Sequence, residues 1–231
     1  LSSSNTNSTM TTSRPGRQPI TALILSSDTD GTGSDGSTIQ PIVLNSEREL
    51  ENEFESLKEV LKDKKAVWSA RCDALKRIQA LVYGGACEFD NFMPLLQLMK
   101  DPIATQLGEL RSSIIREACH TVNVLSKYLG DRFESFGDFF IPCLFKLVVV
   151  TIQVISDSGN HCLRTIIKNS RLLKAIPLIL ETVSSRKTHG SLRTRCAEYM
   201  LQLLEEAVQT NVDRYVDQFL GALQVCLSDS L

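Results

Sequence analysis

A recurring pair of helical segments is the feature that most limits how this chain can fold. Three apolar segments with a proline in the same setting, "FMPLLQL", "FIPCLFKL" and "AIPLIL", each precede a longer amphipathic helix. When the second helices are aligned on a small residue, the intervals are 44, 44 and 35 residues (Ala74, Ala118, Cys162, Ala197). This period is typical of stacked HEAT or armadillo repeats. The sequence therefore predicts an all-α solenoid of antiparallel helix pairs, with four complete pairs and a fifth begun over 211–227.

The first predicted pair carries clear local signals. "SERE" forms a capping box in which Ser46 and Glu49 satisfy each other's backbone amides. Apolar residues then recur at spacings of three and four, and the basic "KDKK" at 62–65 suits the negative end of the helix dipole. The second helix is expected from Trp68 to the "GG" at 84–85.

Composition divides the chain into two regions. Residues 1–45 are rich in Ser, Thr and Gly, a composition that buries too little apolar surface to fold, so we expect a disordered linker. Residues 46–231 form the predicted HEAT-repeat domain, which we expect to be truncated at its C-terminal end because the fifth pair is only begun.

The glycine run "DGTGSDGS" (30–37) matches the G-x-G-x-x-G spelling of a dinucleotide site. Such a site needs a strand directly before the glycines and a helix directly after them. Here "SSDTD" separates the apolar run 20–25 from the first glycine, and Pro41 stands where the helix should form. We interpret the match as accidental, and a dehydrogenase ranks far behind a binding function.

The remaining chemistry of the sequence also argues against an enzyme. Seven scattered cysteines without a C-x-x-C pair indicate a reducing compartment and small apolar roles. The three histidines have no metal-ligand spacing and no recognisable catalytic partners, so we expect no catalytic residue, no metal and no cofactor. The apolar run 143–155 contains Lys146 and is too short to cross a membrane.

The loops inside each helix pair must lie along one edge of a solenoid, because the topology repeats. We predict these loops at 62–68, 101–111, 154–160 and 184–193. They carry a series of basic residues on a chain of net charge −2 (Lys62, Lys64, Lys65, Arg111, Arg186, Lys187, Arg193). Such an edge either suits an acidic partner or consists of ordinary solvated helix ends.

Trp68, the single tryptophan, also has two interpretations. It precedes Leu75 by seven residues and Ile78 by ten, so it fits the first core position of its helix. It also stands beside the lysine cluster at a helix tip, where an aromatic side chain could anchor a partner. Periodicity leaves both interpretations open.

Two stretches of the sequence resemble those of a known protein family. "WSARCDALKRIQALVYGGACEFDNF" (68–92) and "ELRSSIIREACHTVNVLSKYLGDRFE" (109–134) closely resemble the second TOG domain of the CLASP microtubule-associated proteins, and the resemblance covers roughly residues 40–228. It implies a non-enzymatic paddle of HEAT repeats that binds tubulin through its intra-repeat loops. It further implies a protein that suppresses microtubule catastrophe and promotes rescue at plus ends, the spindle and kinetochores, in the cytoplasm and cytoskeleton.

The resemblance also implies the contact residues. Trp68 would dock on tubulin from the first loop, beside Lys65, with Arg111 in the second loop, Ser158 in the third, and Lys187 and Arg193 in the fourth. Other plus-end proteins would bind outside this fragment, since the S-x-I-P signal for end-binding proteins is absent from it. We expect a monomer with no nucleic-acid or membrane partner. The alternative is a general HEAT-repeat adaptor that binds a protein on its concave second-helix face.

Overall fold

The computed structural model describes residues 36, 38–172, 174–206 and 212–228. Within these residues the secondary structure is helical, with no β-strand, which confirms the predicted all-α class. In chain order the α-helices are α1 (Glu47–Lys62), α2 (Trp68–Tyr83), α3 (Phe92–Leu107), α4 (Ser112–Leu129), α5 (Glu134–Val148), α6 (Gln153–Asn169), α7 (Ala175–Ser184), α8 (Gly190–Glu205) and α9 (Val216–Ser228). Three short 3-10 helices, η2 (Ala86–Glu88), η3 (Gly130–Phe133) and η4 (Val212–Tyr215), join some of the pairs.

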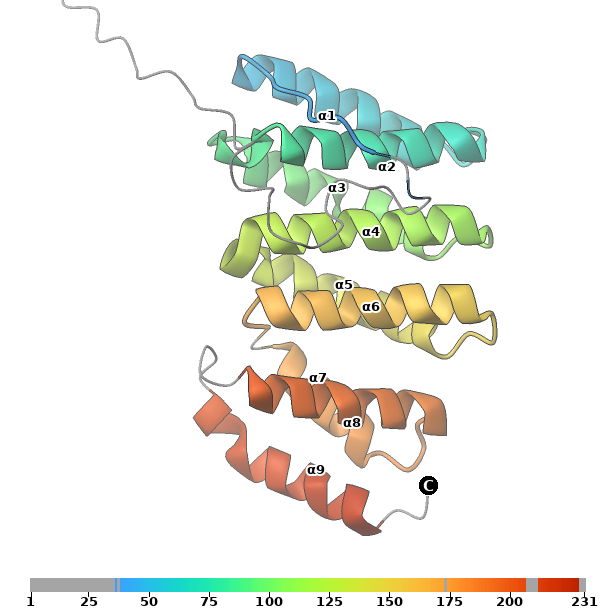
Figure 1. Cartoon of the computed structure of the whole chain (residues 1–231), viewed down its shortest axis with the longest axis vertical. Coiled ribbons are helices and arrows are strands. Elements are labelled where there is room, and N and C mark those ends of the chain that lie inside the picture. The colour runs from blue at the N-terminus through green and yellow to red at the C-terminus, as the bar shows by residue number, and fades with distance from the viewer. Residues whose placement is uncertain (1–35, 37, 173, 207–211, 229–231) are drawn as a thin grey trace, which may run out of the picture.

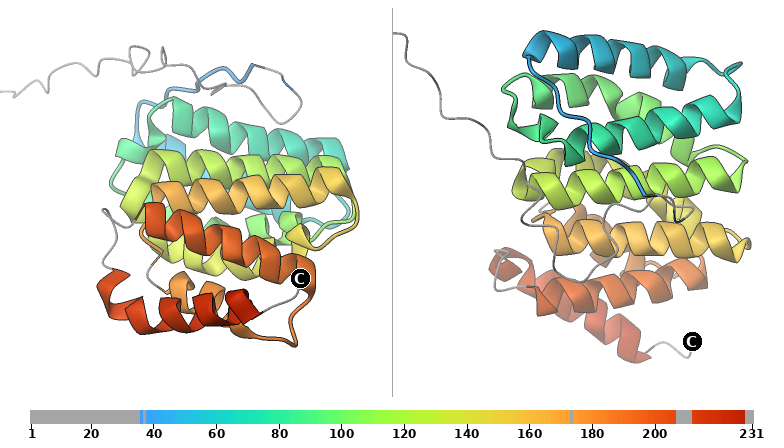
Figure 2. Two further views of the ribbon diagram at one scale, coloured as in Figure 1. Left: turned by 60° about the horizontal axis from the view of Figure 1, so that its bottom comes forward. Right: turned by 45° about the horizontal axis from the view of Figure 1, so that its top comes forward.

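The helices stack as two layers. The second helices α2, α4, α6 and α8 pack on one another in sequence and form what we call the second-helix layer. The first helices α1, α3 and α5 form the other layer, and α9 packs on α7 as the start of a fifth unit (Figure 1). Two further views show the same stacking (Figure 2). The result is the predicted solenoid of helix pairs.

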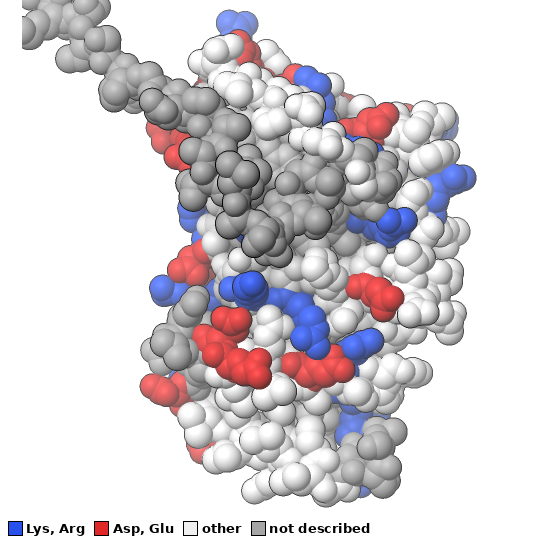
Figure 3. All heavy atoms as spheres, viewed as in Figure 1, with Lys and Arg blue, Asp and Glu red and all other residues white. Residues whose placement is uncertain are grey.

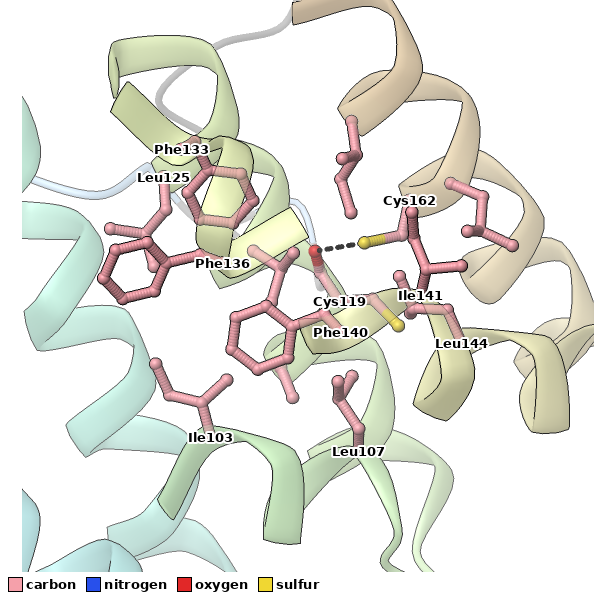
Figure 4. Close-up of a cluster of buried hydrophobic side chains, with 14 of the residues drawn as sticks. Ile103, Leu107, Cys119, Leu125, Phe133, Phe136, Phe140, Ile141, Leu144 and Cys162 are labelled. Carbon is pink, nitrogen blue, oxygen red and sulfur yellow. Dashed lines mark hydrogen bonds between the residues drawn. The ribbon is translucent and has the colours of Figure 1, made fainter. Parts of the chain in front are cut away.

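The core lies between the two layers. Phe133 stacks on Phe136 and on Phe140, with ring centroids 5.7 and 6.3 Å apart. Cys119 and Cys162 lie in the same cluster, where the Cys162 thiol donates a hydrogen bond to the Cys119 carbonyl oxygen at 3.5 Å (Figure 4). All seven cysteines have free thiols, and five are buried and pack as small apolar side chains.

The chain packs on the helices already before the predicted boundary at residue 46. Ile39 is only 8% exposed, and the Ile42 amide donates to the Ala80 carbonyl oxygen at 2.9 Å. This segment lies so close to Gly84 that a Cβ there would stand 1.8 Å from the Ile42 carbonyl oxygen. Residues 38–45 are therefore part of the domain, because their few apolar side chains cover α2 despite a linker-like composition.

Most of the predicted linker, residues 1–35, lies outside the described residues, and so do Gly31 and Gly33. Residues 38–45, the described segment between Gly36 and α1, contain no helix. Among the described helices, none combines the length and the apolar character needed to span a membrane.

Candidate binding edge

The loops inside the helix pairs lie along one edge of the solenoid, at the right in Figure 1. We call this the intra-repeat edge. It consists of the segments between α1 and α2, α3 and α4, α5 and α6, and α7 and α8 (63–67, 108–111, 149–152, 185–189). The predicted placement of these loops on one side of the molecule is therefore correct.

The predicted third loop, 154–160, was wrong, because α6 already begins at Gln153. Its "SDSG" letters are typical of a loop, yet Ser158 lies in the helix and donates to the Val154 carbonyl oxygen at 2.7 Å. Gly159 is buried, and a Cβ there would stand 2.8 Å from the Leu147 Cβ. The glycine thus serves helix packing, and Ser158 is a half-buried helical residue instead of a loop contact.

The first seven residues of the predicted second loop, 101–107, are likewise helical, because α3 continues to Leu107. Pro102 is accommodated inside that helix and is buried. The actual loop is short and ends at Arg111, which occupies the N-cap position of α4. Arg111 therefore lies on the intra-repeat edge, as predicted.

Trp68 and Arg111 are brought together there. Trp68 is the first residue of α2 and is 44% exposed, so it is an edge residue and not a core position. The Arg111 guanidinium carbon lies 4.8 Å from the centroid of the Trp68 ring, a cation–π contact. This stacked pair joins the edges of the first and second helix pairs.

A buried arginine positions the second loop beside this pair. Arg71, one turn after Trp68, donates through Nη1 to Glu109 Oε1 at 2.6 Å and to Gln106 Oε1 at 3.2 Å. Gln106 in turn donates to the Leu61 carbonyl oxygen at 2.8 Å, at the end of α1. Sequence reasoning missed Arg71, because its role depends on contacts across 35 and 38 residues of chain.

The edge also carries exposed apolar residues that sequence reasoning missed. Leu110 is 96% exposed, directly before Arg111, and Val67 is exposed directly before Trp68. Ile152 and Val154 are exposed at the start of α6. The sequence signal for such a residue is weak: it is a single apolar residue inside a polar loop, as Leu110 is in "GELR". We call Val67, Leu110, Ile152 and Val154 the apolar edge residues.

The basic residues of the edge fall into two classes. Lys64 and Lys65 are exposed in the first loop, where the Lys65 amide donates to Asp63 Oδ1 at 2.8 Å and fixes the turn. Lys187 is exposed in the fourth loop. Arg193 differs, being 9% exposed with its Nε donating to the Val183 carbonyl oxygen at 3.2 Å near the end of α7. The side chain stabilises a helix end inside the fold, and its predicted tubulin contact stays a prediction.

Nothing in the described part of the chain resembles a metal centre, since no group of three or more His, Cys, Asp or Glu side chains is suitably placed there. Burial raises the pKa of the Cys87 and Cys196 thiols to about 12. These thiols stay protonated at neutral pH and are poor nucleophiles. The edge offers stacking, apolar contact and positive charge, which are the means of binding a protein surface.

Comparison of the sequence with known proteins identifies its family. The family model described as CLASP N terminal matches residues 50–231. A CLIP-associated protein of Arabidopsis thaliana is 38% identical over 84% of this chain, and CLIP-associating protein 1 of Xenopus tropicalis is 31% identical over 83%. In each case the matched region spans 13% of the relative's length. The chain belongs to the CLASP N-terminal family.

Proposed function

We propose that this chain is a non-enzymatic tubulin-binding module that contacts tubulin through its intra-repeat edge. The observation that carries the proposal is the exposed stack of Trp68 and Arg111, held between two helix pairs. Family membership directs the choice of tubulin as the partner.

The chemistry of the edge suits such a contact. A tryptophan whose orientation is fixed by a cation–π partner loses little entropy on binding, and Trp and Arg are the residues that most often dominate interface energies. The apolar edge residues would exclude water around the stack. Lys64, Lys65 and Lys187 would complement an acidic surface and accelerate association. Ser158 and Arg193 are not part of this proposed contact.

The wider biology is proposed on the same basis. We infer a microtubule-stabilising role that suppresses catastrophe and promotes rescue, at plus ends, the spindle and kinetochores. The assignment to the second TOG domain is also a proposal. Partners of CLIP type, which the names of the relatives suggest, would bind regions outside this chain.

The test is microtubule co-sedimentation of the chain, with tubulin gel filtration beside it, for the wild type and for Trp68→Glu. We expect Trp68→Glu to weaken binding by at least about ten-fold, because it replaces the anchor with a charge of the wrong sign. Leu201→Glu is the matched control, since Leu201 is also an exposed apolar residue but lies on α8, away from the edge.

Two results would contradict the proposal. One is unchanged binding by a Trp68→Glu chain that has the wild-type circular dichroism spectrum and melting temperature. The other is an equal loss of binding for Leu201→Glu. The second result would favour the adaptor function, for which the structure offers a hollow of about 720 Å³ on the second-helix layer.

A further inference from the structure

The amine of Lys100 on α3 has surroundings unlike those of the exposed lysines. Figure 3 shows the face of the second-helix layer, where Lys and Arg side chains lie at the surface beside Asp and Glu side chains. Lys127 and Lys168 belong to that layer and are exposed in the last turns of α4 and α6, where a cation suits the helix dipole. Lys100 belongs to the layer of first helices and is half-buried, so this explanation does not extend to it.

Two phenylalanine rings of α5 flank the Lys100 amine. Its Nζ atom lies 4.5 Å from the centroid of the Phe136 ring and 5.5 Å from that of Phe139. Phe136 is 2% exposed, and Phe139 packs on the core, with its ring centroid 5.3 Å from that of Phe140. The rings take the place of water around the amine, and their attraction for a cation offsets only part of that lost hydration.

The protein supplies the amine with few acceptors in return. Among the described residues, Lys100 Nζ donates one hydrogen bond, to the Ser135 carbonyl oxygen at 3.3 Å, and forms no ion pair. Asp101 and Asp138 act on it electrostatically from a longer distance. Because an ammonium group has three N–H donors, this environment solvates the charged form poorly.

These surroundings favour the neutral amine. Burial lowers the pKa of Lys100, while Asp101 and Asp138 oppose that change and Lys174 adds to it. Glu134 acts on the Asp138 carboxyl in turn. The net direction is downward, so a larger fraction of Lys100 than of an exposed lysine is neutral at a given pH. The neutral amine is the nucleophilic form, and desolvation is a recognised way of activating a lysine.

We propose that Lys100 is an N-acylation site that accepts an acyl group from a thioester. The neutral Nζ atom attacks the thioester carbonyl carbon, a C–N bond forms and the C–S bond breaks. The nitrogen gives up one proton, which the leaving thiolate takes up. The amide product keeps one N–H to donate to the Ser135 carbonyl oxygen, and an acetyl methyl group would pack against Phe136 and Phe139. This proposal is independent of tubulin binding.

The test is acetylation of the whole chain by acetyl-coenzyme A, with the initial rate at each lysine measured by mass spectrometry of its peptides. At about pH 8, we expect Lys100 to react about three-fold faster or more than Lys64 and Lys65, which are exposed in the first loop. The rate at Lys100 should also level off at a lower pH than theirs. In denaturing urea the difference should disappear, because the fold creates the environment of the amine.

Three variants separate the causes. Asp138→Asn removes a carboxylate that favours the ammonium form, so acetylation of Lys100 should become about two-fold faster. Lys174→Ala removes a like charge, so acetylation should become about two-fold slower. Phe139→Leu admits water to Nζ and should also slow the reaction. Lys64 and Lys65 are the internal standard in every variant, and circular dichroism verifies that each variant is folded.

Three outcomes would overturn the proposal. The first is acetylation of Lys100 in the folded wild type at or below the rate of Lys64 and Lys65. The second is a preference for Lys100 that persists in urea, which would assign the reactivity to the local sequence instead of the fold. The third is an unchanged rate at Lys100 in all three variants, which would show that neither the rings nor the neighbouring charges govern its amine.

Discussion

At the scale of single residues, two glycines with similar surroundings in the sequence have different roles. Gly84 follows α2, and Gly108 follows α3. At Gly84 the extended segment crosses within contact distance, whereas at Gly108 a Cβ would meet its nearest atom at 3.6 Å. Only the first position requires glycine, because only there does a second backbone occupy the space of a side chain.

Gly84→Ala is expected to lower the free energy of unfolding by roughly 1–3 kcal/mol, since the methyl group displaces residues 38–45 from α2. Gly108→Ala is the matched control and should change stability by less than about 0.5 kcal/mol. Urea denaturation followed by circular dichroism measures both. Equal effects of the two substitutions would show that the N-terminal segment is not packed at Gly84.

Asp138 on α5 is expected to make the fold less stable at neutral pH. Burial raises the pKa of this carboxyl, and the nearby Glu134 adds to the rise against the opposite effects of Lys174 and Lys100. A carboxyl whose pKa is raised in the folded state lowers the stability of the fold once the pH exceeds the pKa of the unfolded state. Above that pH the unfolded chain ionises freely, whereas the buried carboxyl in the folded state ionises less readily.

Asp138→Asn should therefore raise the melting temperature at pH 7, and the gain should shrink as the pH falls toward 4. Asp90→Asn, at an exposed position, is the control for the general effect of removing a charge. A gain that stays constant between pH 7 and pH 4 would contradict the assigned cause. Thermal melts across that pH range provide the measurement.

At the scale of elements, α2 determines the position of the loop that follows α3. Arg71 makes this connection through Glu109 and Gln106, inside the fold and out of a partner's reach. Its side chain is 10% exposed. It is thus a positioning residue for Leu110 and Arg111.

Arg71→Met should weaken partner binding by about three- to ten-fold, although Arg71 contacts no partner, because the buried charge pair that holds the loop is lost. The Trp68 fluorescence spectrum should shift as well, since Arg111 would leave the indole ring. Arg71→Lys should restore part of the binding, because it keeps the charge but not both hydrogen bonds to Glu109 and Gln106. If Arg71→Met kept wild-type binding and wild-type Trp68 fluorescence, Arg71 would have no positioning role at the edge.

The sequence predicted the existence of the helices better than the residues at which they begin and end. Helical periodicity located every helix pair, because buried apolar faces recur at regular spacings. It could not locate the start of α6, since "SDSGN" has loop-like composition while Gly159 satisfies a packing need that only the neighbouring helix reveals. Arg111 was expected on the edge, whereas periodicity left Trp68 open between the core and the edge. The contact of the two side chains depends on the stagger between two helix pairs, which no local pattern encodes.

At the scale of the whole molecule, the intra-repeat edge and the hollow on the second-helix layer lie on different sides of one stack. The intra-repeat edge offers aromatic, apolar and basic groups, and the hollow on the second-helix layer is lined mainly by polar side chains. A solenoid permits this separation because each helix pair contacts only its neighbours and presents a loop and a helix face independently. Substitutions in that hollow should therefore leave the proposed binding at the edge intact.

The stack of Trp68 and Arg111 has a mechanical consequence. Trp68 belongs to α2 and Arg111 to the start of α4, so their separation changes whenever the first two helix pairs bend or slide relative to each other. A partner that contacts both side chains selects one curvature of the solenoid from those it samples. In the proposed contact with both side chains, tension that straightens the stack would lower the affinity of the edge for its partner.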